Sequence, residues 1–222
     1  MSKLYLVPTP VGNLEDITYR AIRVLKEADI ILAEDTRKTS ILLKKYSVSK
    51  KLKSFHKFNE HRETDKVIEL LLQGTTIALV ADAGTPGISD PGYLLVRECL
   101  NRDIDIEVLP GPTALIPALV ISGIPCERFI FEGFLPAKKG RNKRLSELGK
   151  VNRTMIFYES PHRLLKTLAE LSVVLGENRK AVVVRELTKI HEEIIRGTLG
   201  ILLEIFENKP VKGEIVLVVE GK

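Results

Sequence analysis

In the first half of the chain, short apolar segments alternate with amphipathic ones. The segments at residues 4–7, 30–33, 52–55, 76–80 and 106–109 predict short β-strands. Apolar residues recur at helical spacing between them, at residues 17–28, 39–46, 67–72, 93–100 and 113–122, and Asp16 is predicted to cap the first of these helices. This alternation of strand and helix predicts a mainly parallel sheet with helices on both faces.

The pattern changes after residue 122. Strands are predicted at residues 129–134, 155–158, 182–185, 192–196 and 214–219, and helices at 141–148, 161–175 and 199–206. Because one of these strands directly follows another, we expect a mixed sheet in this half. We therefore predict two α/β domains, residues 1–115 and 116–222, with a cleft between them, and we interpret SGIPCER at residues 122–128 as a joint.

The composition is typical of a soluble globular protein, with 44% hydrophobic and 28% charged residues among 222. No apolar run approaches the ~20 residues of a membrane span, and the amino terminus lacks a signal-peptide pattern, so we expect a cytoplasmic protein. The two cysteines, Cys99 and Cys126, lie among apolar residues, and the four histidines are scattered. A metal site built from these side chains is therefore not expected.

Positive charge is concentrated in two segments, although the net charge is only +5. Between residues 37 and 62 the only acid is Glu60, and residues 138–150 also carry a single acid among several basic residues. Such clusters favour a polyanionic partner, and a solvated lysine-rich surface is the alternative. The candidates for contacts with nucleic-acid phosphates are Arg37, Lys38, Lys44, Lys45, Lys50, Lys51, Lys138, Lys139, Arg141, Lys143, Arg144 and Arg163.

A glycine-rich segment, VADAGTPGISDPG at residues 80–92, follows a predicted buried strand. Gly84, Gly87 and Gly92 permit positive φ and close approach of a ligand to the backbone. Open α/β sheets bind ligands at the carboxyl ends of their strands, and an ordinary tight turn is the alternative. The segment lacks the residue order of a P-loop, and no G-x-G-x-x-G opens a helix after the first strand. Neither nucleotide hydrolysis nor an ordinary dinucleotide site is indicated.

Polar motifs also follow the other predicted strands. They are PTPVGNLEDIT at residues 8–18, AEDTRKT at 33–39, HKFNEH at 56–61, PGPTALIPAL at 110–119, EGFLP at 132–136, FYESPHR at 157–163 and RELTK at 185–189. In this order, and with the glycine-rich segment, they resemble the tetrapyrrole-methylase-like family of S-adenosylmethionine-dependent methyltransferases over nearly the whole chain. The nearest likeness is to members that methylate a cytidine 2′-oxygen of 16S rRNA in the decoding centre of the small ribosomal subunit.

The resemblance implies that S-adenosyl-L-methionine binds in the cleft between the two domains. The residues expected to meet it are Pro10, Gly12, Asp82, Gly84, Thr85, Pro86, Gly87, Ile88, Ser89, Thr113, Ala114 and Tyr158. It also implies that 16S rRNA or the small ribosomal subunit is the partner, that the basic clusters contact RNA, and that the protein is a homodimer.

A general base would activate the ribose hydroxyl for methyl transfer. Glu159 is the favoured candidate because it lies at a strand end, and Asp35 and His56 are the others. The alternative for Glu159 is a structural one, in which it caps the following helix or pairs with Arg163.

Two other functions remain open. A methyltransferase of the same fold could act on a tetrapyrrole or on a protein side chain, since the carboxylates of a tetrapyrrole also attract positive charge. The second is a non-catalytic RNA-binding module. Aromatic residues make up only 5% of the chain and form no sheet motif of the RRM type, so we favour an enzyme over this module.

Overall fold

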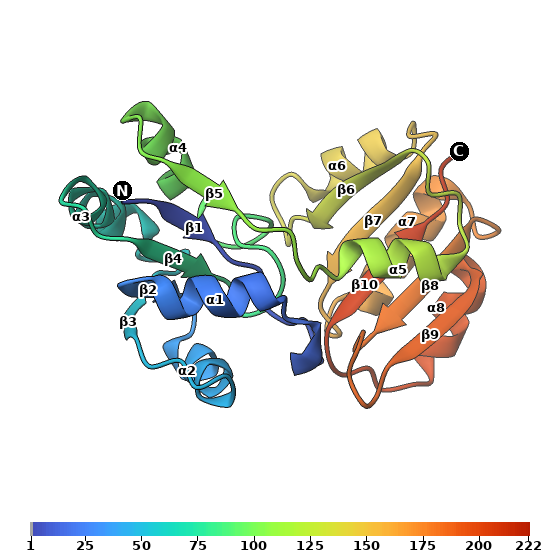
Figure 1. Cartoon of the computed structure of the whole chain (residues 1–222). Coiled ribbons are helices and arrows are strands. Elements are labelled where there is room, and N and C mark those ends of the chain that lie inside the picture. Colours follow the sequence, from blue (N-terminus) through green and yellow to red (C-terminus); the bar gives the residue numbers. More distant parts are fainter. Residues whose placement is uncertain (1) are drawn as a thin grey trace. The chain divides into compact units, whose positions relative to one another are not determined.

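The contacts of the computed structural model, which describes residues 2–222, divide the chain into two units (Figure 1). The first unit is Met1–Thr113 and the second is Ala114–Lys222, so the predicted boundary after residue 115 falls two residues beyond this division. The helix that follows the division packs on the second sheet through Ala118 and Leu119. The segment SGIPCER therefore lies inside the second unit, which corrects its interpretation as a joint.

The first unit contains a five-stranded parallel sheet with the strand order β3-β2-β4-β1-β5. Its strands are β1 (Leu4–Leu6), β2 (Ile30–Ala33), β3 (Lys51–Ser54), β4 (Ile77–Val80) and β5 (Ile106–Val108). Its helices are η1 (Leu14–Asp16), α1 (Tyr19–Glu27), α2 (Thr36–Lys45), α3 (Glu60–Leu72) and α4 (Tyr93–Asn101).

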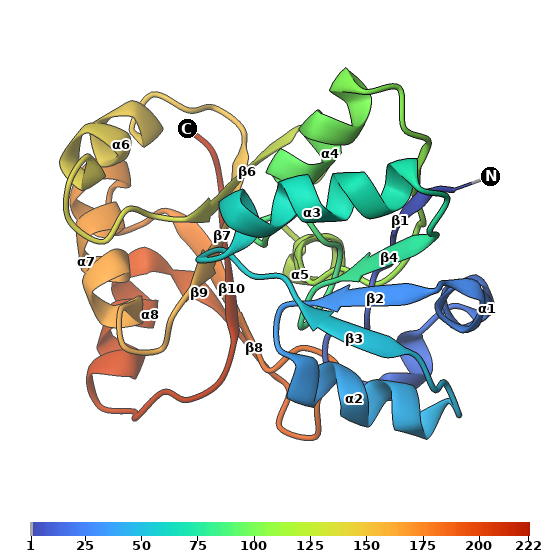
Figure 2. The same ribbon diagram turned by 90° about the vertical axis from the view of Figure 1, so that its left-hand side faces the viewer.

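Both faces of this sheet are covered by helices, and β2 shows how the sequence achieves this. Successive strand residues point to opposite faces, so Ile30 and Leu32 join the core under α3 and α4. Ile31 and Ala33 join the core under α1 and α2. Figure 2 shows α3 and α4 on one side of the sheet and α2 on the other. A strand buried on both faces must be apolar throughout, as these four residues are.

The second unit contains a mixed five-stranded sheet with the order β6-β7-β10-β8-β9. Its strands are β6 (Phe129–Phe134), β7 (Thr154–Glu159), β8 (Lys180–Arg185), β9 (Glu193–Thr198) and β10 (Ile215–Val219). Only β6 and β7 pair in parallel within this described sheet. Its helices are α5 (Leu115–Ser122), α6 (Arg141–Leu148), α7 (Leu164–Leu175) and α8 (Leu199–Glu207).

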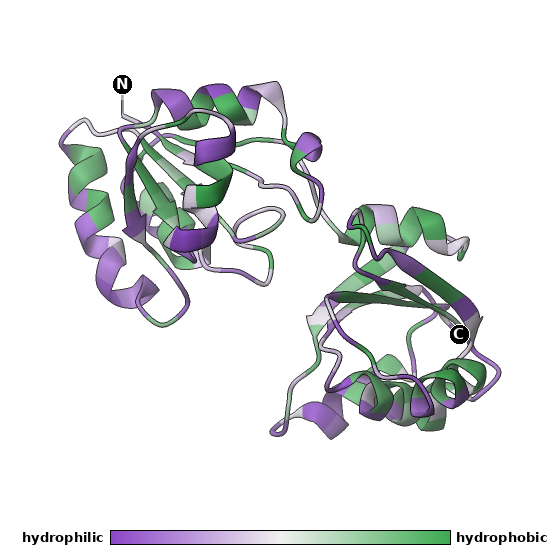
Figure 3. Cartoon of the chain, turned by 90° about the horizontal axis from the view of Figure 1, so that it is seen from below, coloured by the Kyte–Doolittle hydropathy of each residue, from purple (hydrophilic) through white to green (hydrophobic). Residues whose placement is uncertain are grey.

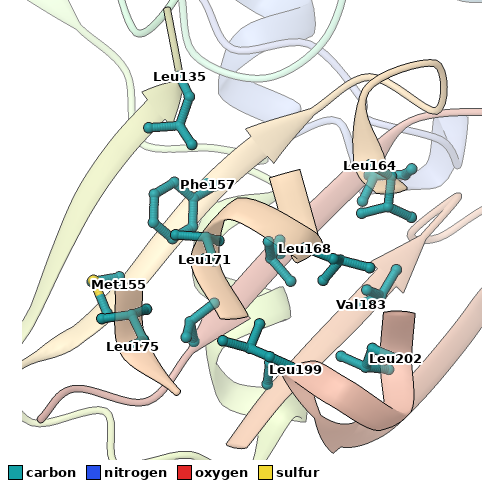
Figure 4. Close-up of a cluster of buried hydrophobic side chains, with 14 of the residues drawn as sticks. Leu135, Met155, Phe157, Leu164, Leu168, Leu171, Leu175, Val183, Leu199 and Leu202 are labelled. Atoms are coloured by element: carbon teal, nitrogen blue, oxygen red, sulfur yellow. The ribbon is translucent and has the colours of Figure 1, made fainter. Parts of the chain in front are cut away.

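In the second unit, α5 covers one face of the sheet and α6, α7 and α8 cover the other. In Figure 4, Leu171 of α7 lies beside Phe157 of β7, and Leu164 and Leu168 of α7 belong to the same buried cluster. In Figure 3 the strands of this unit are mostly green, as expected for a sheet buried on both sides. None of the helices described in residues 2–222 has the length and apolar character needed to cross a membrane.

The predicted α/β class, with a parallel sheet in one half and a mixed sheet in the other, is confirmed. The predicted helix cap at Asp16 is wrong. Asp16 ends η1, and Thr18 caps α1 instead, its hydroxyl oxygen accepting a hydrogen bond from Ala21 N at 3.0 Å. Asp16 and Thr18 both carry side-chain acceptors near this helix start, and the backbone conformation determines which of them caps the helix.

Candidate functional site

In the first unit, the loops that follow β1 and β4 are joined at one edge of the sheet. Thr9 N donates to Gly84 O at 3.0 Å, and Gly84 N donates to Thr9 O at 2.9 Å. The buried Thr9 hydroxyl donates to Ala81 O at 3.0 Å. Because all five strands are parallel, their carboxyl ends meet at this same edge, which is where open α/β sheets bind ligands.

The glycines of these loops are required by geometry. Gly84 and Gly87 have φ of 78° and 86°, and Ser89, which is not a glycine, has φ of 64°. The loop after β5 also reaches this edge, because a Cβ on Gly111 would lie 2.8 Å from Cβ of Pro8. The predicted cofactor-binding residues of the first unit therefore lie on loops that contact one another. Among them Pro10 and Pro86 are buried, Thr85 and Thr113 are half-buried, and Gly12 and Ile88 are exposed.

Three carboxyl groups, Glu34, Asp82 and Asp90, lie at this edge and influence one another. Burial and the negative charge of Asp82 raise the pKa of Glu34. Burial, followed by the charges of Glu34 and Asp82, raises the pKa of Asp90 to about 7. Asp82 accepts hydrogen bonds from Asp35 N at 3.0 Å and Lys38 Nζ at 2.6 Å. Asp90 has no hydrogen-bond donor or cation partner among residues 2–222.

Glu34 and Asp90 were not predicted as site residues, although their positions in the sequence pointed to this edge. Glu34 stands directly after a buried strand, and Asp90 lies inside the glycine-rich segment. Their side chains do not make a metal site, since no group of three or more potential metal ligands gathers in the described part of the chain.

Asp35, a predicted catalytic residue, has a structural role in the first unit. It caps α2 by accepting from Arg37 N at 2.9 Å, and it pairs with Arg37 Nη2 at 2.7 Å. The hydrogen bonds from Arg37 hold the pKa of Asp35 well below its usual range. Such a carboxylate is a weak base. The third candidate, His56, accepts a hydrogen bond from Phe58 N at its Nδ1 atom, at 3.2 Å.

The basic segment of the first unit presents lysines without partners. Lys44, Lys45 and Lys51 are exposed, Lys50 is half-buried, and none of the four makes a side-chain ion pair within residues 2–222. The one acid of this segment, Glu60, is buried and accepts from Gly92 N at 2.9 Å and Leu94 N at 3.1 Å, at the start of α4. Its carboxylate is therefore bonded inside the unit and forms no ion pair with these lysines.

In the second unit, Glu159 belongs to a buried hydrogen-bond network. Its side chain is fully buried, and Oε1 accepts from Ser160 N at 2.8 Å and lies 3.4 Å from Arg163 Nε. Oε2 accepts from the Thr167 hydroxyl at 2.6 Å. Both carboxylate oxygens are therefore occupied, which favours the structural alternative over a general base. Arg163, half-buried, also donates to Leu135 O, so its contact with phosphate would compete with these partners.

The structure corrects the prediction that Arg141 contacts RNA, because this residue is 3% exposed. Its guanidinium donates to Thr167 Oγ1 at 2.8 Å, Pro136 O at 3.0 Å and Glu170 Oε2 at 2.7 Å. The arginine thus links α6 to α7. The other predicted residues of this segment, Lys138, Lys139, Lys143 and Arg144, are exposed.

Tyr158, predicted to meet the cofactor, lies on β7 among aromatic rings. Its ring centroid is 4.9 Å from that of Phe131 and 5.8 Å from that of Phe134. Ala114, the other predicted cofactor residue of this unit, is half-buried directly before α5.

A family model described as Tetrapyrrole (Corrin/Porphyrin) Methylases matches residues 3–202. A protein of Thermotoga maritima called ribosomal RNA small subunit methyltransferase I is 48% identical over 222 residues, covering 100% of both chains. A protein of the same name from Escherichia coli O157:H7 is 50% identical over 223 residues, covering 99% of this chain and 78% of its own length.

Solved structures with the same fold are more distant in sequence. A uroporphyrin-III-C-methyltransferase from Thermus thermophilus superposes with a TM-score of 0.70 at 20% identity, covering 99% of this chain and 94% of its own. A diphthine synthase superposes with a TM-score of 0.75 at 13% identity, covering 99% and 90%. The chain belongs to the tetrapyrrole (corrin/porphyrin) methylase family, and within it to the group of the ribosomal RNA small subunit methyltransferases I.

Proposed function

We propose that this protein transfers a methyl group from S-adenosyl-L-methionine to the 2′-oxygen of a cytidine in 16S rRNA, in the decoding centre of the small ribosomal subunit. The observation that carries the proposal is the identity of 48–50% over essentially the whole chain to proteins named ribosomal RNA small subunit methyltransferase I. The solved structures at 20% identity or less share the fold alone, so a tetrapyrrole or a protein side chain is not favoured as the acceptor.

The strand-end edge of the first unit fits such a cofactor. S-adenosylmethionine supplies an electrophilic methyl group on a sulfonium cation. Three carboxyl groups, Asp90, Glu34 and Asp82, lie at this edge, and Asp90 lacks a cation of its own among the described residues. An approaching cation would favour the ionised form of Asp90. The positive-φ backbone at Gly84 and Gly87 leaves no Cβ between the loop and a ligand.

A structure from the family supports the same assignment of cofactor. One crystal structure of uroporphyrin-III C-methyltransferase from Thermus thermophilus is a complex with S-adenosylhomocysteine, and its TM-score to this chain is 0.69 at 20% identity. We assign Pro10, Thr85 and Thr113, with their neighbouring glycines, to the same role here because their loops contact one another at the carboxyl edge of the sheet.

RNA would contact Lys44, Lys45, Lys50 and Lys51 of the first unit, which make no side-chain ion pair among residues 2–222. Phe58 lies in the loop after β3 and is 95% exposed beside His56, with ring centroids 6.1 Å apart. An exposed aromatic ring beside cations suits a single-stranded RNA, because bases stack on the ring while the cations neutralise phosphates.

The decisive experiment is transfer of labelled methyl from S-adenosylmethionine to small ribosomal subunits that lack their native modifications, with free rRNA in parallel. Label at a ribose 2′-oxygen of a decoding-centre cytidine is the expected result. Label on a ribosomal protein and none on RNA, or no label at all, would refute the proposal.

Salt dependence tests the RNA surface separately. Each phosphate contact to a single strand contributes about −0.7 to the slope of log affinity against log salt. Replacing Lys44, Lys45 and Lys51 with glutamine should therefore flatten the slope by ~2. Lys26→Gln, an exposed charge change on α1, is the control and should leave the slope as it is. An unaltered slope in the triple variant would remove these lysines from the interface.

A further inference from the structure

A pocket of about 340 Å³ opens at the carboxyl end of β6, with all its lining residues in the second unit. Phe134 and Leu135 form its apolar side, and Lys143, Arg144 and Glu132 form its charged side. Leu135 is anchored in the core beside α7, near Phe157 in Figure 4. None of its lining residues belongs to the loops that follow the strands of the first sheet.

Two flat groups in this pocket each contact neighbouring side chains that restrict their orientation. Phe134 is 53% exposed, and its ring is supported by Tyr158 at 5.8 Å, which itself packs against Phe131. Arg144 donates from Nε to Glu132 Oε2 at 2.7 Å and from Nη1 to Glu147 Oε2 at 3.0 Å. The guanidinium plane is fixed by these carboxylates, yet 44% of the side chain remains exposed.

Hydrogen bonds also hold the backbone that lines the pocket. The carbonyl of Pro136 accepts a hydrogen bond from the buried Arg141 at 3.0 Å, and the carbonyl of Leu135 accepts one from Arg163. These contacts fix the backbone that follows Phe134. A partly exposed ring and a guanidinium that already contact their neighbours lose less conformational entropy when a flat ligand binds.

The charges indicate what kind of flat ligand fits. Glu132 and Glu147 both form ion pairs with Arg144 and neutralise its charge. The planar guanidinium is therefore better suited to stacking on a flat ligand than to attracting an anion. Lys138, Lys139 and Lys143 are exposed and make no side-chain ion pair within residues 2–222. A nucleotide carries a planar base and an anionic phosphate, so it fits both the stacking surface and the exposed lysines.

We infer that this pocket binds one nucleobase of a single-stranded RNA, stacked on Phe134 and Arg144, with the adjoining phosphates at Lys138, Lys139 and Lys143. The inference rests on the proposed function for the identity of the RNA, 16S rRNA. It adds RNA contacts in the second unit to those proposed for the lysines of the first unit.

The test compares Phe134→Ala with Phe134→Trp and with Val173→Ala, a control at a residue of α7 that is 87% exposed. Affinity for a single-stranded decoding-centre RNA is measured by fluorescence anisotropy, and affinity for S-adenosylmethionine by calorimetry. We expect Phe134→Ala to weaken RNA binding by about tenfold, since stacking on one aromatic side chain accounts for roughly that much. Phe134→Trp should retain binding, Val173→Ala should match the parent, and cofactor affinity should stay constant.

A second readout uses charge. Replacing Lys138, Lys139 and Lys143 with glutamine should flatten the salt slope by ~2, whereas Phe134→Ala should lower affinity at every salt concentration without altering the slope. RNA affinity that is unchanged in Phe134→Ala would overturn the inference, as would a loss of cofactor affinity in place of RNA affinity. If the parent methylates rRNA while Phe134→Ala binds RNA normally, the pocket fails and the proposed function stands. If the parent transfers no methyl to RNA, the function fails, and the binding comparison still decides the pocket.

Discussion

Replacing Asp90 with asparagine should make the protein more stable at neutral and alkaline pH. The pKa of this carboxyl is raised from 3.8 to about 7, first by burial and then by the charges of Glu34 and Asp82. The folded protein therefore holds the proton more tightly than the unfolded chain does. The stability that this group contributes is fully present below its unfolded pKa, near 4, and is lost as the pH rises through 7.

The magnitude follows from the size of the pKa shift. A difference of about 3 pKa units at ~1.4 kcal/mol each gives an upper bound of ~4 kcal/mol. Asp90 is only partly buried, so solvent screening reduces this to about 1–2 kcal/mol. An asparagine side chain at this position carries no charge to desolvate. The variant should therefore gain about 1–2 kcal/mol over the parent above pH 7 and gain nothing near pH 4.

Urea denaturation followed by circular dichroism, at half-unit steps from pH 4 to pH 8.5, measures this difference. The midpoint should rise in Asp90→Asn at high pH while the slope stays constant. Asp65→Asn, at an exposed residue of α3, controls for the change in net charge. A difference between Asp90→Asn and the parent that is constant across the pH range, or a loss of stability at pH 8, would refute the reasoning.

The same carboxyl should have the opposite effect on ligand binding. If an ionised Asp90 attracts the sulfonium, parent affinity for S-adenosylmethionine should rise as the pH increases through 7, and Asp90→Asn should lose this rise. S-adenosylhomocysteine lacks the sulfonium charge and is the matched control ligand. A site that costs stability and serves binding is a common compromise in enzymes. Equal effects of Asp90→Asn on both ligands would remove the electrostatic role.

Three further substitutions test the packing that supports the site. Glu60→Ala should lower the free energy of unfolding by ~1–3 kcal/mol, because Gly92 N and Leu94 N lose their buried acceptor. Glu69→Ala, at an exposed position of α3, is the control. Equal urea midpoints for the two variants would contradict the prediction. Gly111→Ala should lower the free energy of unfolding, measured by thermal denaturation, by ~1–3 kcal/mol, because the new Cβ would lie 2.8 Å from Cβ of Pro8. An unchanged melting temperature would show that the two loops can move apart. Thr167→Val should lower the free energy of unfolding by ~1–3 kcal/mol, because Glu159 Oε2 loses a donor and Arg141 Nη2 loses an acceptor. The rate of amide hydrogen exchange in β7 and α7 should rise. Exchange rates like those of the parent would show that the network does not stabilise these two elements.

Much of the fold could be predicted from the sequence because burial leaves a periodic pattern. The strand Ile30–Ala33 is apolar at every position, as a strand with helices on both faces must be. The helix Arg141–Leu148 and the strand Phe129–Phe134 have the predicted bounds. The start of α1 could not be predicted in this way, since Asp16 and Thr18 are both good caps and the local backbone conformation decides which one is used.

The order of the elements, the two kinds of sheet, the family motifs and the loops that carry them could all be predicted from the amino-acid sequence. It could not determine what each charged side chain does. Glu60 and Arg141 look like members of basic surface clusters, yet both are buried and hydrogen-bonded to residues distant in the sequence. Asp90 looks like an ordinary turn residue, and its pKa near 7 arises from burial and from the charges of Glu34 and Asp82. Apolar patterning is local and periodic, whereas the pairing and desolvation of a charge depend on which distant segments the fold brings beside it. The roles of these charged side chains therefore become visible only in the folded protein.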